Sequence, residues 1–323
     1  MSLAVYPLIF EPILKDRIWG GTKLETYLGK KNLPTPTTGE SWELSAVEGD
    51  VSVVKDGVYK GKPITDILEL YPEEVLGAKV HKQFGTQFPL LFKFLDADKE
   101  LSIQVHPNDE LARKRHNSFG KTEMWYVMQA DEGSRIIVGF KEKSSQEQYL
   151  KHLADKDLIE ILNEVEVKKG DVFFLETGTI HAIGAGIVVA EIQQTSDITY
   201  RIYDWDRVDA QGNSRELHVD QALDAMNYNT TDTQKHYTTI ENKSNAMVNC
   251  PYFTTSYLPL NGSMGVSKDG SSFTVYICTE GEFSIEAGGE KYNFKKGDTV
   301  LVPAILKVFI LSGTATLLEI CIS

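Results

Sequence analysis

Residues 101–109 read Leu-Ser-Ile-Gln-Val-His-Pro-Asn-Asp. Their alternation of apolar and polar side chains is typical of a half-buried β-strand, and the proline marks its end. The apolar side chains at positions 101, 103 and 105 are expected to face the core. The opposite face presents Ser102, Gln104 and His106. A polar row of this kind, backed by core, predicts a functional site on that face of the strand.

The sequence around this strand is dominated by short β-type runs separated by turn residues. The expected strands cover residues 124–129, 135–140, 171–175, 187–194 and 200–203. Strands at this spacing predict an antiparallel sandwich or barrel. Helical periodicity occurs at residues 63–84, 146–164 and 216–226, so we expect helices as insertions around a β core.

Two further segments supply residue types that bind metals. Glu123 lies in the run at residues 120–126, and His181 follows a Gly-Thr turn within residues 176–183. Zn²⁺ binds imidazole nitrogen and carboxylate oxygen, and a catalytic site leaves one position open. Alternate residues on paired strands point into one barrel mouth, so we predict a site formed by His106, Glu123 and His181. The same set of ligands also suits Fe(II) or Mn(II).

A weak internal repeat predicts a second β unit. The sequence Lys-Lys-Gly-Asp at residues 168–171 returns at residues 295–298, beyond a polar stretch at about 229–245 that is typical of a linker. In this register His181 falls on Val308 and Glu191 on Leu318, and an alignment of residues 131–133 with 279–281 places Ser271 opposite Glu123. We therefore expect a ligand-bearing domain at 1–240, with helical insertions at about 60–87 and 143–165, and a domain at 241–323 without the ligands.

Composition limits the partners and the cellular compartment. The chain has 323 residues, with 33 Lys and Arg against 46 Asp and Glu, for a formal charge of −13. Nucleic acid and anionic membranes are therefore poor partners, and an anionic small substrate would need a local positive cluster. The three scattered cysteines argue against a disulfide framework. The first residues contain no signal-peptide pattern and no apolar run approaches bilayer length, so we expect a cytoplasmic protein.

Several motifs occur in one order along most of the chain, at residues 39–45, 89–95, 101–107, 121–126, 178–181 and 196–201. Through them the chain resembles the short, bacterial form of the type I mannose-6-phosphate isomerases, in the cupin superfamily. The resemblance implies a mainly β protein with two cupin-like antiparallel β-barrels, or jelly rolls, and helical insertions around the first. It also implies a zinc-dependent isomerase that acts on a small-molecule sugar phosphate.

The same resemblance implies roles for individual residues. One Zn²⁺ per chain would be held by His106, Glu123 and His181, with Gln104 either as a fourth ligand or as a contact to substrate. The catalytic arginine falls on Arg201. The groups that handle protons or position the substrate fall on Lys121, Glu191 and Asp197. Longer family members have a proline before the ligand glutamate where this chain has Thr122, so the loop around Lys121 is expected to differ.

The implied reaction interconverts mannose 6-phosphate and fructose 6-phosphate by moving a hydrogen between C1 and C2. We expect proton transfer through a cis-enediol(ate), with zinc and Arg201 stabilising the developing charge. Arg201 could instead clamp the 6-phosphate, because its guanidinium fork suits either charge distribution. Lys93, Lys121 and Arg201 would form the positive cluster for the phosphate, with Ser102 as a hydroxyl donor. Lys93 could equally form an ion pair with a nearby carboxylate.

Two other readings use the same scaffold. An Fe(II)-dependent cupin oxygenase would use a similar ligand set. A non-catalytic sugar-binding double cupin would have lost ligands, and the first barrel has lost none. We expect a monomer or homodimer that binds neither nucleic acid nor membrane.

Overall fold

Strands dominate the computed structural model, which describes residues 4–208 and 211–322, so the mainly β fold is confirmed. The expected domains at 1–240 and 241–323 include residues 1–3, 209–210 and 323, which lie outside the described residues. All paired strands are antiparallel. The strands form three large sheets and one short hairpin, and each of the five strands expected from the sequence is present.

The first sheet has seven strands, in the order β1 (Ile13–Asp16), β2 (Thr38–Leu44), β5 (Leu90–Ala97), β12 (Ile187–Gln194), β7 (Glu123–Ala130), β10 (Val172–Leu175) and β14 (Gln234–Lys235). The second has five, in the order β13 (Tyr200–Tyr203), β6 (Ile103–Val105), β11 (His181–Ile183), β8 (Arg135–Phe140) and β9 (Leu162–Glu166). The hairpin consists of β3 (Ala46–Val47) and β4 (Asp50–Val51).

The C-terminal sheet has six strands. Its order is β15 (Asn245–Asn249), β16 (Thr254–Ser267), β20 (Val308–Cys321), β17 (Thr274–Ala287) and β18 (Glu290–Lys295), and β19 (Thr299–Val302) pairs with β17. The helices are α1 (Lys23–Thr26), α2 (Ile64–Leu70), α3 (Pro72–Leu76), α4 (Ala78–Phe84), α5 (Asp109–His116), α6 (Gln146–Asp155), the 3₁₀ helix η1 (Leu158–Ile161) and α7 (Val219–Ala225). None of the helices within the described residues has the length and apolarity needed to cross a membrane.

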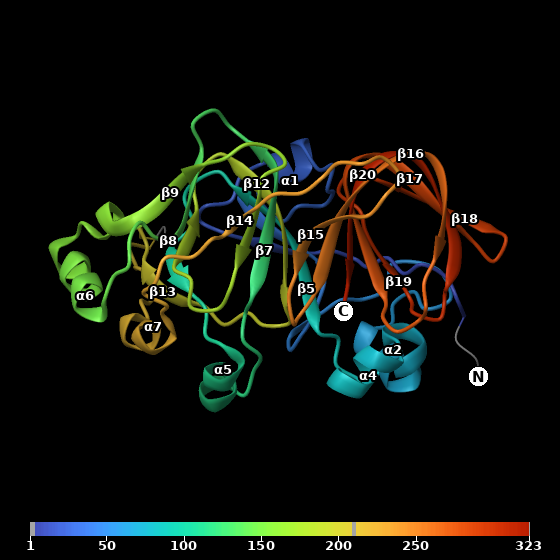
Figure 1. Ribbon diagram of the computed structural model, residues 1–323, viewed down its shortest axis with the longest axis horizontal. Coiled ribbons are helices and arrows are strands. Elements are labelled where there is room, and N and C mark those ends of the chain that lie inside the picture. The colour runs from blue at the N-terminus through green and yellow to red at the C-terminus, as the bar shows by residue number, and fades with distance from the viewer. Residues whose placement is uncertain (1–3, 209–210, 323) are drawn as a thin grey trace.

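The seven-stranded sheet is buried on both faces, as strand β7 illustrates. Trp125 and Val127 belong to an apolar cluster shared with the five-stranded sheet. Met124 and Tyr126, which alternate with them, belong to a second cluster shared with the C-terminal sheet. A third cluster packs α6 and α7 against the outer face of the five-stranded sheet. Figure 1 shows this order of layers, with α6 and α7 at one end and the C-terminal strands, orange to red, at the other.

The largest apolar cluster joins the N-terminal and C-terminal sheets. It combines Phe92 of β5 with Phe273 and Ile320 from the C-terminal part of the chain. The rings of Phe88 and Phe273 lie 5.0 Å apart between centroids. Burial of this apolar surface, at about 25 cal/mol per Å², holds the two parts together.

The sheets found in the described residues are open, and no closed barrel is formed by their hydrogen bonds. The mainly β character therefore holds, whereas the expectation of two barrels stays a prediction.

The helical segments differ from the predicted ones in their boundaries. The segment at 63–84 is not one helix but three short ones. Pro72 begins α3, and α3 ends before Gly77, whose φ of +91° is not helical. A Cβ on Gly77 would lie 2.4 Å from the backbone oxygen of Ser271. The prediction of helix to residue 164 is wrong, since α6 ends where Lys156 takes φ +60° and residues 162–166 form β9.

The repeat predicted from the sequence is present in the backbone of the two turns. Lys168 N–H donates to Asp171 Oδ2 at 2.9 Å, and Lys295 N–H donates to Asp298 Oδ2 at 2.8 Å. Gly170 and Gly297, which follow the lysines in each turn, have φ of +92° and +87°. The two turns therefore have the same hydrogen bond and the same left-handed glycine.

The strands that flank these turns also correspond, with one correction. His181 begins β11 and Val308 begins β20, as the register predicts. The correction concerns the strand that pairs with each turn. Gly170 N–H donates to Val127 O, and the matching Gly297 N–H donates to Cys278 O. Val127 and Cys278 therefore occupy the same position in the two sheets. Counting back along the strand from each of these residues, Glu123 corresponds to Thr274, so the predicted alignment of Glu123 with Ser271 is wrong. The residue at this place in the C-terminal sheet is still not a carboxylate.

Candidate active site and metal centre

Three of the predicted site residues form a row across the five-stranded sheet. Gln104 of β6 pairs with His181 of β11 on one side and with Arg201 of β13 on the other. Paired residues of neighbouring strands project to the same face. The alternation of residues 101–106 thus places Gln104 between a candidate metal ligand and the candidate catalytic arginine.

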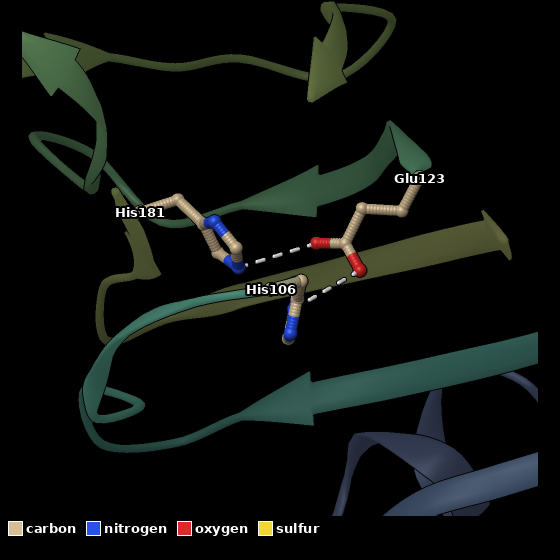
Figure 2. A group of neighbouring side chains, drawn as sticks. All are labelled: His106, Glu123 and His181. Carbon is tan, nitrogen blue, oxygen red and sulfur yellow. Dashed lines mark ion pairs between the residues drawn. The ribbon is translucent and has the colours of Figure 1, made fainter. Parts of the chain in front are cut away.

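The predicted metal ligands converge on one point. Figure 2 shows the carboxylate of Glu123 facing both imidazoles, with one carboxylate oxygen toward each ring. His106 Nε2 lies 3.5 Å from Glu123 Oε2, and His181 Nε2 lies 3.4 Å from Glu123 Oε1. The three ligand atoms lie within 4.8 Å of one another, and all three residues are buried.

The hydrogen bonds of the histidines leave the correct nitrogen for a metal. His106 Nδ1 lies 2.9 Å from Ile198 O, and His181 Nδ1 lies 2.8 Å from Thr179 O. A carbonyl can only accept, so each Nδ1 carries the proton and each Nε2 keeps its lone pair. Burial lowers the pKa of His181 to about 4, and burial together with the nearby Lys121 charge lowers the pKa of His106 well below its usual range. Both rings are neutral, as metal ligands must be.

Glu123 completes a donor set that fits a divalent cation. Neither of its buried oxygens accepts a well-aligned hydrogen bond from the described residues. The Lys121 ammonium group approaches instead, with Nζ 2.7 Å from Glu123 Oε2 and 3.0 Å from His106 Nε2. Oε2 thus has only this ammonium group beside it, and Oε1 has no donor among the described residues, which is costly for a buried carboxylate. Together with the two neutral imidazoles, this carboxylate forms a donor set of the kind that Zn²⁺ accepts. Gln104 lies next to this shell, with its side-chain amide 3.2 Å from His181 Nε2.

A second row faces the site from the seven-stranded sheet. Lys93 of β5 pairs with Trp42 on one side and with Glu191 on the other, and Glu191 pairs in turn with Trp125. Lys93 Nζ lies 3.2 Å from Glu191 Oε1, and Trp125 Nε1–H donates to Glu191 Oε2 at 2.9 Å. Lys93 therefore forms the ion pair considered from the sequence. Burial alone would raise the pKa of Glu191, but the charges of Lys121 and Lys93 outweigh it and hold this pKa well below its usual range.

A cavity of about 540 Å³ lies between the two rows. Seven of the ten predicted residues line it: Lys93, Ser102, Gln104, Lys121, Glu191, Asp197 and Arg201. The three candidate metal ligands are buried beside Lys121 and Gln104. The structure therefore brings all ten residues together, with Asp197 exposed at the edge. This volume is within the range of small-ligand sites.

The loop that carries Lys121 is fastened by a small hydrogen-bond network. Thr122 N–H donates to Gln194 Oε1 at 2.9 Å, a bond that a proline at this position could not make. Asp109 Oδ1 accepts from Gly120 N–H at 2.8 Å and from the Gln194 amide at 3.0 Å. Asp109 Oδ2 accepts from the hydroxyl of Tyr252, in the C-terminal part of the chain, at 2.9 Å. The C-terminal part thus supports the loop of the site.

Sequence reasoning missed two arginines that line the same cavity, Arg17 and Arg215. Arg17 directly follows β1, and Arg215 lies between β13 and α7. Neither position belongs to an alternating or helical pattern, so no periodic signal marked them. The charge of these side chains was the only sequence signal.

Known protein families match the N-terminal and the C-terminal parts of the chain. The family described as phosphomannose isomerase type I, catalytic domain, matches residues 8–134, and the family described as mannose-6-phosphate isomerase, cupin domain, matches residues 242–322. Mannose-6-phosphate isomerase ManA of Bacillus subtilis is 39% identical over 96% of both chains. The mannose-6-phosphate isomerase of Streptococcus mutans is 39% identical over 95% of both chains.

The fold is also similar to a solved structure. The crystal structure of the mannose 6-phosphate isomerase from Bacillus subtilis has a TM-score of 0.89 and 34% identity, covering 97% of this chain and 99% of that chain. Similarity of this extent covers both the ligand-bearing sheets and the C-terminal sheet. The chain belongs to the type I phosphomannose isomerase family.

Proposed function

We propose that the protein interconverts mannose 6-phosphate and fructose 6-phosphate by proton transfer between C1 and C2. The observation that carries this proposal is the buried group of His106, Glu123 and His181, which lies beside a row ending in Arg201. The cavity above it exposes several cations and carboxylates to one ligand. An aldose–ketose isomerase needs this combination of a charge-stabilising site and proton-transfer groups.

The proposed cofactor is one Zn²⁺ ion per chain, held by His106, Glu123 and His181. Gln104 is the proposed fourth ligand or, alternatively, a contact to the sugar. When bound, zinc would act as a Lewis acid that polarises the substrate oxygens at C1 and C2 without redox chemistry. The neutral imidazoles and the carboxylate oxygens without well-aligned donors support this assignment.

The side chains around the ligands would then handle charge and protons. Arg201 has no carboxylate within ion-pair distance among the described residues, so its charge is available to an enediolate oxygen. Burial would lower the pKa of Lys121, but Glu123 and Glu191 outweigh it and raise that pKa. Lys121 therefore holds its proton, and its ammonium group is suited to donate a hydrogen bond to a substrate oxygen. Glu191 and Asp197 complete the set of proposed proton-handling or positioning groups.

Ser102 and Lys93 retain proposed roles in substrate binding, because both line the cavity. Ser102 offers a hydroxyl. Lys93 would act through its ion pair with Glu191, which fixes its ammonium group.

The domain organisation, the location and the oligomeric state of the protein are also proposals. The chain would comprise two cupin-like barrels, with a catalytic domain at 1–240 and a domain without metal ligands at 241–323. The cytoplasmic location and the monomeric or homodimeric state stay predictions from the sequence.

Removal and return of the metal tests the proposal. We expect the conversion of mannose 6-phosphate to fructose 6-phosphate to stop after chelation and to return with added zinc. In D₂O, proton transfer should place deuterium at C2 of mannose 6-phosphate formed from fructose 6-phosphate, which NMR detects, without consumption of oxygen. Inactivity of the zinc-loaded protein would reject the proposed function. Turnover that requires oxygen would instead indicate the oxygenase.

A further inference from the structure

Two arginines line the cavity without belonging to the metal-binding group. Arg17 lies just after β1 and Arg215 lies between β13 and α7, and both contribute to the lining of the 540 Å³ cavity that contains Gln104 and Lys121. Both side chains are partly exposed, with 33% and 28% of their surface accessible. A ligand in the cavity can therefore reach both of them.

Each of these arginines forms an ion pair with a buried carboxylate. Arg17 Nε–H donates to Glu40 Oε1 at 2.6 Å. Arg215 donates through Nε–H to Asp204 Oδ2 at 2.7 Å and through Nη2 to Asp204 Oδ1 at 2.5 Å. Among the described residues, Nη2 of Arg17 and Nη1 of Arg215 have no hydrogen-bond acceptor. Both guanidinium groups are thus fixed in place while part of each fork remains available.

Positive charge is in excess around these two arginines. Asp204 pairs with Arg207 as well as with Arg215, so one carboxylate serves two cations. Arg201 lies near them, and its Nε is buried without an acceptor among the described residues. Burial lowers the pKa of Arg201, and the charges of Arg215, Arg207 and Arg17 lower it further. A group with about two negative charges would relieve this repulsion, as a phosphate monoester does at neutral pH.

The lysines expected to bind phosphate are already engaged. Lys93 pairs with Glu191 at 3.2 Å, and Lys121 pairs with Glu123 at 2.7 Å. Their positive charges are balanced by carboxylates on the metal side of the cavity. The unbalanced charge lies on the arginine side, beyond Arg201.

We infer that Arg17 and Arg215 form the subsite for the phosphate group of the substrate. This inference rests on the proposed function for the identity of the sugar phosphate. The phosphate would accept hydrogen bonds from the free guanidinium nitrogens of both arginines, and Arg201 would remain at the reacting end, next to Gln104. Charge-assisted bonds between arginine and phosphate are strong and geometrically selective, so this subsite would also orient the sugar chain toward the metal ligands.

The test uses the zinc-loaded full chain and three variants. Arg215→Gln and Arg17→Gln each remove one proposed contact, and Arg207→Gln is the matched control. Arg207 shares Asp204 with Arg215 but does not line the cavity. For the first two variants we expect the KM for mannose 6-phosphate and the inhibition constant for inorganic phosphate to rise roughly ten- to a hundredfold, with a much smaller change in kcat. In Arg207→Gln both constants should stay near those of the wild type.

Two outcomes would overturn the inference. One is that neither constant changes in Arg215→Gln and Arg17→Gln. The other is that Arg207→Gln raises them equally, which would assign the effect to the Asp204 network. Arg215→Lys retains the charge and should recover part of the phosphate affinity. Circular dichroism of each variant will show whether it is folded, which separates loss of a contact from loss of structure.

Failure of this inference differs from failure of the proposed function. Direct calorimetric binding of inorganic phosphate reports the subsite even if the wild type does not isomerise mannose 6-phosphate. Conversely, normal wild-type turnover with unaffected variants would reject the subsite alone.

Discussion

Replacing Glu123 with glutamine is expected to lower kcat by on the order of a thousandfold or more. The substitution keeps the shape of the side chain but removes the carboxylate that faces both His106 and His181. A Lewis-acid metal contributes several kcal/mol to the transition state, and about 1.4 kcal/mol corresponds to a tenfold change in rate. Zinc content by mass spectrometry and kcat from a coupled assay check the two effects separately.

Glu166→Gln provides the control for this prediction. Glu166 lies at the end of β9 in the five-stranded sheet, and its side chain is 63% exposed. We expect that variant to retain zinc and wild-type turnover. If Glu123→Gln also kept one zinc per chain and a normal kcat, the assignment of Glu123 as a ligand would be wrong.

Replacing Arg201 with alanine should lower kcat by roughly a hundred- to a thousandfold, as removal of a charge-stabilising donor does in other active sites. Arg201 pairs with Gln104 in the sheet and has a buried Nε without an acceptor among the described residues. Its guanidinium group would therefore gain its strongest interaction when charge develops on the substrate. KM for mannose 6-phosphate should change far less than kcat.

The matched substitution is Arg135→Ala, which removes a 54% exposed arginine from strand β8 of the same sheet. It should leave both constants unchanged. Arg201→Lys should restore only part of the lost rate, because an ammonium group lacks the planar fork. A raised KM with an unchanged kcat in Arg201→Ala would reassign Arg201 to the binding of the phosphate.

The candidate metal-binding group could be predicted because its signals are local. Alternation across residues 101–106 determines which side chains share a face, and in the structure both Gln104 and His106 lie next to His181. His181 likewise follows a turn that its own sequence encodes. When three such segments each contain a residue that can bind a metal, the only further information needed is which strands pair with one another.

Other features depend on partners that are distant in the sequence. Arg17 and Arg215 reach the cavity because Glu40 and Asp204 hold them, and no pattern near either arginine encodes that contact. Lys93 was left between an ion pair and a phosphate contact, because its partner Glu191 lies on a neighbouring strand.

The helical boundaries show the limits of periodicity. The apolar stripe from Tyr149 continues through Leu158 to Leu162 as if in one helix, yet Lys156 adopts a left-handed conformation and the chain turns into β9. Helix α5 was missed because it has few apolar residues. Its start was nevertheless encoded, since the Asn108 side chain caps it by accepting from Leu111 N–H.

The apolar cluster shared by the seven-stranded and C-terminal sheets has a consequence for cooperativity. All four tryptophans lie before residue 206, and all three cysteines lie after residue 249. Fluorescence therefore follows the loss of the N-terminal sheets, and the reactivity of the Cys278 thiol, which is buried in β17, follows the loss of the C-terminal sheet. Because Phe92, Phe273 and Ile320 belong to one core, both probes should report the same urea midpoint in a single transition. Two separate midpoints would mean that each half can stay folded without the other.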